Sequence, residues 1–274
     1  MLPNLIIIGG AKCGTTALHQ YLLRHPEIWM SQEKELNFFS LNWHRGLGWY
    51  EGFFPRPAAV RGEASPRYTE YPLISGVPQR MAGVVGDAKL IYLVRDPVDR
   101  FVSHYTFDRA FGRWKLPFAE TVERIESIPF GVNGRYWLQL EQYLEHFRAE
   151  QILVVDHDAL LVRRDETLRT IFRFLGVDDS FSSPRFDVVH NRAPDRRRRL
   201  PAVLTARALR RALGTGRAWR VQQRVPHSLY LLFSETLERP VVDERMRARF
   251  VEYYAEDVAR LRAFTGLELG SWSL

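Results

Sequence analysis

The sequence feature that most constrains this chain is the segment LIIIGGAKCGTTAL at residues 5–18. Four apolar residues, 5–8, are followed by two glycines, and a lysine, a third glycine and two threonines then lead into a helical pattern. A buried strand, a glycine-rich turn and a helix start present several backbone N–H groups to an anion, and the helix dipole adds to the attraction. The segment therefore predicts a phosphate-binding loop in an α/β fold.

The position of the lysine distinguishes this loop from the phosphate loop of ATP-dependent enzymes. That loop has the pattern G-x-x-x-x-G-K-[ST], and counting from Gly9 puts Gly14 in register but places Thr15 where the lysine belongs. Lys12 lies inside the loop instead, where its ammonium can lie over a phosphate oxygen. We therefore expect the loop to bind a 5′-phosphate rather than a metal–triphosphate complex, and a purely structural glycine turn is the alternative.

Short apolar runs alternate with helical patterns along much of the chain, which predicts βαβ units and a parallel sheet. Strands are expected at 5–8, 29–30, 60–63, 89–94 and 151–155, and helices at 15–25, 134–147, 166–175 and 243–264, with a turn and a helix after residue 94. We expect one domain over residues 1–274, in which residues 200–240 form a helical insertion or a flap on the substrate side.

Composition narrows the class of protein. The 274 residues are 46% apolar and 26% charged, as in an ordinary globular protein. No apolar stretch approaches the roughly 20 residues of a membrane span, and the first strand starts too early to leave room for a signal peptide. The single cysteine, Cys13, excludes an internal disulfide and fits a reducing compartment. We expect a cytoplasmic protein, with its oligomeric state left open.

A second candidate element, LIYLVRDPVDRFVSHY at residues 90–105, follows the clearest interior strand. Arg95 stands at the strand end, Pro97 turns the chain, and Ser103 follows two helical turns later. A guanidinium and a hydroxyl in this arrangement can converge on one phosphate. By itself the segment is equally compatible with an ordinary arginine–aspartate turn, and a Walker B role for Asp96 does not fit because Arg95 separates it from the apolar run.

Together, the two elements resemble the sulfotransferase family, whose donor is 3′-phosphoadenosine 5′-phosphosulfate (PAPS). AKCGTTAL is similar to the family's 5′-phosphosulfate loop, and RDPVDRFVSHY is similar to its 3′-phosphate element. The resemblance implies the sulfotransferase fold, a P-loop-like central parallel β-sheet flanked by helices, and a donor site that needs no metal. It assigns these residues to the nucleotide: Lys12, Cys13, Gly14, Thr15, Thr16 and Ala17 on the 5′ side, and Arg95 and Ser103 on the 3′ side.

Between these elements, EKELNFF, GLGWYEGFFP and GEASPRY resemble in order and spacing the glycan-directed branch, the heparan sulfate N- and 3-O-sulfotransferases and their bacterial relatives. In that branch a glutamate of the first segment is the catalytic base. The match implies that Glu35 is the base and that Lys12 stabilises charge on the leaving phosphate oxygen. Three alternatives stay open: Glu33 as the base, a surface ion pair of Glu35 with Lys34, and His44, by analogy with the small-molecule branch.

Two positions depart from the glycan enzymes. Ala64 follows Glu63 where they have a lysine, and Asn37 stands where the 3-O-sulfating members have a histidine; Arg67 is a candidate to replace the missing charge. Heparan is therefore not the expected acceptor, and a bacterial enzyme acting on a small molecule, lipid or sugar fits better. We expect residues 43–54 and 200–240 to line the acceptor pocket.

A late basic segment also has an implied role, because family members close a basic loop over the 3′-phosphate. We expect one of the arginines at 196–199 to do this, with Arg197 and Arg198 as the candidates.

The sequence thus predicts a sulfotransferase that moves a sulfuryl group from PAPS to a hydroxyl or amine and releases 3′-phosphoadenosine 5′-phosphate. A P-loop kinase acting on a small molecule is the main alternative, and it requires Mg²⁺ and a lysine at position 15. The net charge of +7 suggests nucleic-acid binding, but we find no nucleic-acid motif and expect no such partner. A family member that binds the nucleotide without catalysis is the third alternative.

Overall fold

The structure, a computed structural model, describes residues 1–188 and 237–274. Its centre is a five-stranded parallel sheet in the order β2-β3-β1-β4-β5. The strands are β1 (Leu5–Gly9), β2 (Ile28–Met30), β3 (Val60–Ala64), β4 (Lys89–Val94) and β5 (Ile152–Asp156). Each of the five predicted strands is confirmed to within one residue. Because all five are parallel, their carboxyl ends meet at one edge of the sheet.

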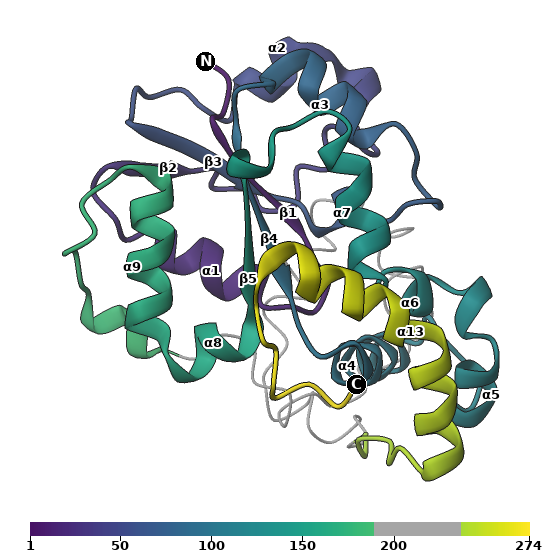
Figure 1. Cartoon of the computed structure of the whole chain (residues 1–274). Helices are drawn as coiled ribbons and strands as arrows, with labels where there is room; N and C mark the ends of the chain where they lie inside the picture. Colours follow the sequence, from purple (N-terminus) through teal and green to yellow (C-terminus); the bar gives the residue numbers. More distant parts are fainter. Residues whose placement is uncertain (189–236) are drawn as a thin grey trace, which may run out of the picture.

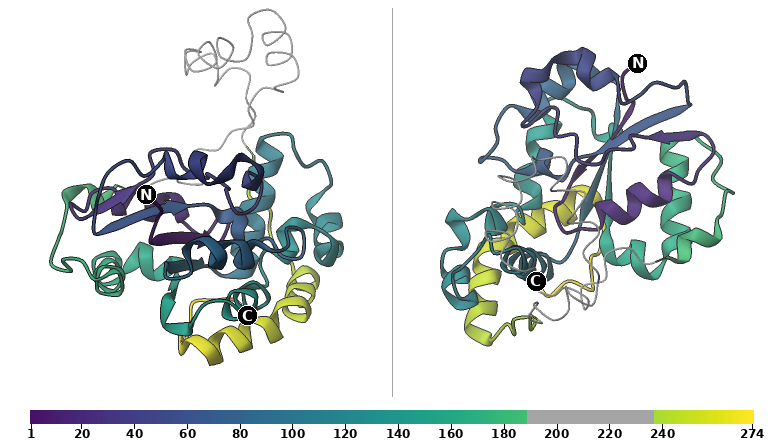
Figure 2. Two further views of the ribbon diagram at one scale, coloured as in Figure 1. Left: turned by 90° about the horizontal axis from the view of Figure 1, so that it is seen from above. Right: turned by 180° about the vertical axis from the view of Figure 1, so that it is seen from behind.

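Helices cover both faces of this sheet. On one side lie α1 (Thr15–Leu22), α8 (His157–Val162) and α9 (Arg164–Leu175), and on the other lie α3 (Val77–Val85), α7 (Tyr136–Leu144) and α13 (Glu244–Thr265) (Figure 1). The view from behind keeps the same separation (Figure 2). Shorter helices are α2 (Gly46–Glu51), α5 (Phe118–Glu123) and α6 (Pro129–Val132). With helices on both faces, strands β1 and β4 are almost entirely apolar and buried, as parallel strands require.

Local signals in the sequence explain where the helices begin and end. Helix α4 (Pro97–Ala110) starts after Asp96, whose carboxylate accepts a hydrogen bond from the backbone N–H of Asp99 at 2.9 Å. Gly176, with φ of 78°, ends α9 as predicted. Helix α1 ends at Leu22 and not at residue 25, because the N–H groups of Arg24 and His25 bond three residues back and tighten the last turn.

Two expectations concern parts of the chain that the structure does not describe. Most of the predicted insertion at residues 200–240 and all of the arginine cluster at 196–199 lie outside the described residues. The single-domain assignment therefore stays a prediction. Within residues 1–188 and 237–274, no helix has both the length and the apolar character needed to cross a membrane.

Candidate active site

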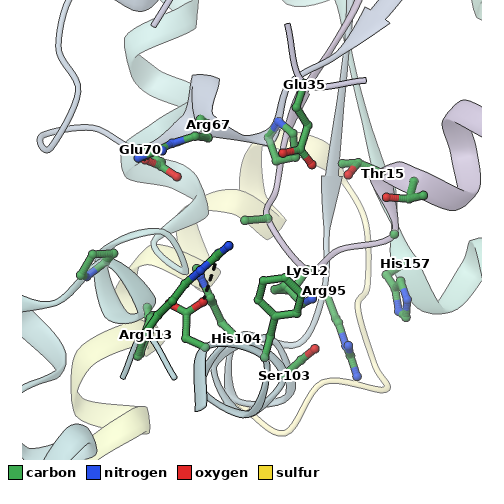
Figure 3. Close-up of a pocket in the computed structure, with 18 of the residues that line it drawn as sticks. Lys12, Thr15, Glu35, Arg67, Glu70, Arg95, Ser103, His104, Arg113 and His157 are labelled. Carbon is green, nitrogen blue, oxygen red and sulfur yellow. Dashed lines mark hydrogen bonds and ion pairs between the residues drawn. The ribbon is translucent and has the colours of Figure 1, made fainter. Parts of the chain in front are cut away.

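A cavity of about 1270 Å³ lies at the edge of the sheet where the strands end. The segment that follows each strand contributes to its lining: Lys12 after β1, Glu35 after β2, Arg67 after β3, Arg95 after β4 and His157 after β5 (Figure 3). Open α/β sheets bind their ligands at this edge. The topology therefore brings residues that are far apart in the sequence into one site.

The predicted phosphate loop forms between β1 and α1. Lys12 and Gly14 have left-handed backbone angles, with φ of 70° and 93°, and these turn the chain into the helix. Thr15, Thr16 and Ala17 line the cavity in the first turn of α1, where backbone N–H groups have no acceptor within the helix. The loop thus presents donors and a helix N-terminus to the cavity, which suits an anion.

Lys12 reaches from this loop to α4. Its Nζ lies 3.9 Å from the centroid of the Phe107 ring, a cation–π contact. Nearby, burial lowers the pKa of His104 well below its ordinary value, and the charges of Arg100 and Lys12 lower it further. His104 is therefore neutral at physiological pH, and the positive charge at this part of the cavity comes from lysine and arginine.

Arg95 and Ser103 lie on the same side of the cavity, with Arg95 at the end of β4 and Ser103 on α4 (Figure 3). The guanidinium of Arg95 pairs with Asp99 at 3.2 Å. The hydroxyl of Tyr136 holds the backbone of Arg95 at two points, accepting from its N–H at 3.2 Å and donating to its carbonyl at 2.7 Å. Tyr136 is completely buried, so it acts here as a support for Arg95 and not as part of the cavity wall.

Glu35 lies at the edge of the cavity between Thr15 and the side chains of Arg67 and Glu70 (Figure 3). Its backbone is left-handed, with φ of 63°, and its N–H donates to the carbonyl of Ala64 at 3.0 Å. About half of the side chain is exposed, at 51%. Its rivals Glu33 and His44 are exposed and do not line the cavity. The structure thus brings Glu35, and neither rival, to the site.

Comparison with known proteins identifies the family. The family model for the sulfotransferase domain matches residues 2–205. The chain belongs to the sulfotransferase family. It is 30% identical over 204 residues to the bifunctional heparan sulfate N-deacetylase/N-sulfotransferase 4 of Mus musculus, covering 66% of this chain and 23% of that protein. It is 32% identical over 200 residues to the corresponding enzyme 1 of Xenopus tropicalis, covering 65% and 22%.

A solved structure supports the same family. The crystal structure of a sulfotransferase from Alicyclobacillus acidocaldarius superimposes with a TM-score of 0.72 at 26% identity, and the match covers 100% of both chains. The predicted sulfotransferase fold, a central parallel sheet flanked by helices, is therefore confirmed. The chain spans less than a quarter of the length of the curated relatives named above.

Lys34 makes a contact with the phosphate loop that the sequence did not predict. Its ammonium lies 3.0 Å from Oε1 of Glu35, so the predicted ion pair exists, and 3.5 Å from the hydroxyl of Thr15 in the phosphate loop. Only 18% of the Lys34 side chain is exposed. Lys34 therefore connects the segment that carries the candidate base with the loop that carries the candidate phosphate donors.

A buried carboxylate, Glu63 at the end of β3, also helps to hold the segment that follows β2. Glu63 is fully buried and accepts hydrogen bonds from the hydroxyls of Tyr50 at 2.9 Å, Ser65 at 2.6 Å and Tyr68 at 2.6 Å. Burial raises its pKa, and the three hydroxyls oppose that increase. The Ser65 oxygen also accepts the backbone N–H of Asn37 at 3.0 Å. Glu63 thus joins the segments that follow β2 and β3.

The prediction that residues 43–54 line the acceptor pocket is wrong. No residue of that loop lines the cavity. Tyr50 and Phe54 are buried in the core, where Phe38 stacks on Tyr50 at a centroid distance of 4.3 Å, and Trp43 is 42% exposed. The cavity beyond Glu35 is lined instead by the Arg67–Glu70 ion pair, at 3.1 Å, and by apolar side chains. These apolar residues are Leu73, Ile74, Trp114, Pro129 and Phe130. Aromatic residues in a sequence do not show whether they face a ligand or the core.

The remaining predicted site residues have different outcomes. Cys13 is fully buried, its Sγ lies 3.5 Å from the Tyr136 hydroxyl, and its backbone N–H donates to Gly10, so a nucleotide contact stays a prediction. Arg197 and Arg198 lie outside the described residues. Among the residues that are described, no cluster of three or more His, Cys, Asp or Glu side chains could hold a metal ion.

Proposed function

We propose that this sulfotransferase transfers the sulfuryl group of PAPS to a hydroxyl or amine of a small-molecule, lipid or sugar acceptor and releases 3′-phosphoadenosine 5′-phosphate. One observation carries the proposal: the Lys12 loop, the Arg95–Ser103 element and Glu35 line the same cavity. Its volume of about 1270 Å³ exceeds the ~300–1,000 Å³ of a typical single-ligand pocket, which leaves room for a donor and an acceptor together.

The donor is proposed to bind along the side of the cavity formed by α1 and α4. Backbone N–H groups at the start of α1 and the hydroxyls of Thr15 and Thr16 would bind the 5′-phosphosulfate. The guanidinium of Arg95 and the hydroxyl of Ser103 would bind the 3′-phosphate. Arg197 and Arg198 remain the proposed arginines of a basic loop that closes over the 3′-phosphate.

The chemistry follows from the positions of Glu35 and Lys12. Glu35 would accept the proton of the acceptor hydroxyl or amine as its oxygen or nitrogen attacks the sulfur. A new bond to sulfur forms while the bond between sulfur and the 5′-phosphate oxygen breaks, and the electron pair stays on that oxygen. Lys12 would stabilise the resulting negative charge. In-line transfer of this kind depends chiefly on positioning and charge.

The acceptor is proposed to bind near Arg67 and Glu70, between Glu35 and the apolar lining. The curated relatives carry heparan sulfate in their names, but the lysine that the glycan branch has after Glu63 is Ala64 here. Arg67 supplies a charge in this region, yet it is already paired with Glu70 at 3.1 Å. A smaller acceptor with an apolar body fits these side chains better than a polyanionic chain. A cytoplasmic location and a bacterial origin remain predictions.

A calorimetric titration separates this proposal from the kinase alternative. We expect 3′-phosphoadenosine 5′-phosphate to bind without added metal and to bind more tightly than adenosine 5′-phosphate, which lacks the 3′-phosphate. The change Arg95→Ala should weaken this binding. Binding of ADP with Mg²⁺ but not of 3′-phosphoadenosine 5′-phosphate would overturn the sulfotransferase proposal.

The base is tested by Glu35→Gln, with Glu33→Gln as the matched control. Loss of a general base typically costs about 10²–10⁴-fold in turnover, so Glu35→Gln should lose about that much while it still binds the nucleotide. Glu33 does not line the cavity, and Glu33→Gln should keep near wild-type turnover. Release of the nucleotide product is measured with phenols, amino sugars and hydroxylated lipids as acceptors. Equal turnover of the two variants would exclude Glu35 as the base.

A further inference from the structure

The segment after α13 returns to the site from the far end of the chain. Helix α13 ends at Thr265, and the following residues run past the carboxyl ends of β5 and β4 to reach α4 (Figure 1). Leu269 and Trp272 are buried, at 6% exposure each, although the segment contains no regular element. Arg262 of α13 donates to the carbonyls of Leu269 and Leu274 at 3.3 and 2.9 Å, which fixes the path of the segment.

Three consecutive residues of this segment donate hydrogen bonds to three different carboxylates at the edge of the sheet. The Ser271 hydroxyl donates to Oδ2 of Asp158 at 3.1 Å, and the indole N–H of Trp272 donates to Oδ1 of Asp156 at 3.2 Å. The backbone N–H of Ser273 donates to Oδ2 of Asp96. Asp156 is the last residue of β5, and Asp96 and Asp158 belong to the segments that follow β4 and β5, which supply Arg95 and His157 to the cavity.

Each carboxylate uses its other oxygen to hold part of the candidate site. Oδ1 of Asp96 accepts from Asp99 N–H and caps α4, the helix that carries Ser103. Oδ2 of Asp156 accepts from Ala159 N–H at 3.3 Å and caps α8. Oδ1 of Asp158 lies 3.2 Å from Nδ1 of His157, which lines the cavity. The same carboxylates therefore contact both the segment and the parts of the site.

A fourth contact links Trp272 to Arg95 indirectly, through the ring of Tyr136. Trp272 packs against Tyr136 with 5.7 Å between ring centroids, and Tyr136 holds both backbone groups of Arg95. The Tyr136 hydroxyl also lies 3.5 Å from Cys13 Sγ in the phosphate loop. Displacing the indole would therefore loosen the support of Arg95 as well as the cap of α8.

We infer that Ser271, Trp272 and Ser273 are positioning residues of the donor site, which set the orientation of Arg95, Ser103 and His157 without touching the nucleotide. The inference rests on the proposed function, because it takes Arg95 and Ser103 to bind PAPS in the cavity that His157 also lines. Loss of the three contacts leaves the strands in place but frees the starts of α4 and α8. A misplacement of about 1 Å is enough to cost a large part of the binding or rate at such a site.

Three variants test this inference: a chain that ends at Gly270, Trp272→Phe, and Val258→Ala as the control. Val258 is buried on α13 and makes none of the contacts of residues 271–273 described above, so Val258→Ala should lower stability and leave those contacts in place. Affinity for 3′-phosphoadenosine 5′-phosphate is measured by calorimetry at a temperature where each variant is folded. Amide hydrogen exchange is measured at the starts of α4 and α8.

We expect the shortened chain to bind the nucleotide at least about tenfold more weakly, and its exchange to rise selectively at α4 and α8. Trp272→Phe keeps a ring beside Tyr136 but loses the N–H to Asp156, so its affinity should fall between those of the wild type and the shortened chain. This variant also carries the test if the shortened chain does not fold. Val258→Ala should bind as the wild type does.

Two results would overturn the inference, and they are distinguishable. If the wild type, Trp272→Phe and the shortened chain all bind the nucleotide equally well, residues 271–273 are only structural. If the wild type does not bind the nucleotide, the proposed function fails, and the role assigned to these residues fails with it.

Discussion

Asp257 allows a quantitative test of how burial makes the stability of the protein depend on pH. It lies on α13, is 4% exposed, and its two carboxylate oxygens accept the backbone N–H groups of Trp137 and Leu138 at 2.9 Å each. These are N–H groups of the first turn of α7, so one helix caps another. Burial raises the pKa of Asp257 from its ordinary 3.8 to about 6, and the two N–H donors and Arg135 oppose the increase.

The sign of the pH dependence follows from this direction. The folded state binds the proton of Asp257 more tightly than the unfolded state does, so this group lowers the free energy of unfolding as pH rises from 3.8 to about 6. The difference between these two values corresponds to about 3 kcal/mol. With the same two values, about 2 kcal/mol of this loss falls between pH ~4.5 and pH ~7.5. Asp257→Asn removes the titration and should lack that part of the pH dependence.

Urea unfolding at these two pH values, followed by tryptophan fluorescence, measures the effect. The wild type should lose about 2 kcal/mol more than Asp257→Asn on going from pH ~4.5 to pH ~7.5. Glu256→Gln is the matched control, because Glu256 is the neighbouring residue on α13 and its side chain is 81% exposed. If the stability difference between the wild type and Asp257→Asn is the same at both pH values, the reasoning from burial is refuted.

Two further predictions concern the loop after β1 and the end of β3. Gly14→Ala should reduce nucleotide affinity at least about tenfold, since Gly14 has φ of 93° and a Cβ would lie 3.0 Å from His157 Cδ2. Gly83→Ala on α3 has open space and should leave calorimetric affinity unchanged. Glu63→Ala leaves three buried hydroxyls without their acceptor and should cost about 4 kcal/mol in urea unfolding. A loss below about 1 kcal/mol would contradict that account.

The strands and the phosphate loop could be predicted because their signals are local. Strands β1, β2, β4 and β5 are mainly apolar runs, and Gly14 is the residue type that a left-handed turn favours. The position of Glu35 could not be derived in the same way. An extended segment would point Glu33 and Glu35 to the same side, but Glu35 and Asn37 have φ of 63° and 49°, so the alternation of an extended strand does not hold there.

Contacts between distant parts of the chain could not be predicted either. Nothing near Trp272 in the sequence indicates that its indole meets Asp156, or that Tyr136 supports Arg95. The aromatic loop at residues 43–54 was expected to line the acceptor pocket because its composition suits both a pocket and a core. The stacking of Tyr50 on Phe38 and the hydrogen bond of Tyr50 to Glu63 show which of the two it forms.

The strand order has a consequence for when the site comes into existence during folding. Lys12, Arg95 and residues 271–273 come from the beginning, middle and end of the chain, and they meet only when the strands are paired and the last segment has docked. An early, locally folded piece of the chain thus lacks the complete donor site. A nucleotide that binds only this site selects the fully assembled chain, and at about 100 times its dissociation constant it adds about 2.7 kcal/mol to the free energy of unfolding. Such a nucleotide would then report complete folding.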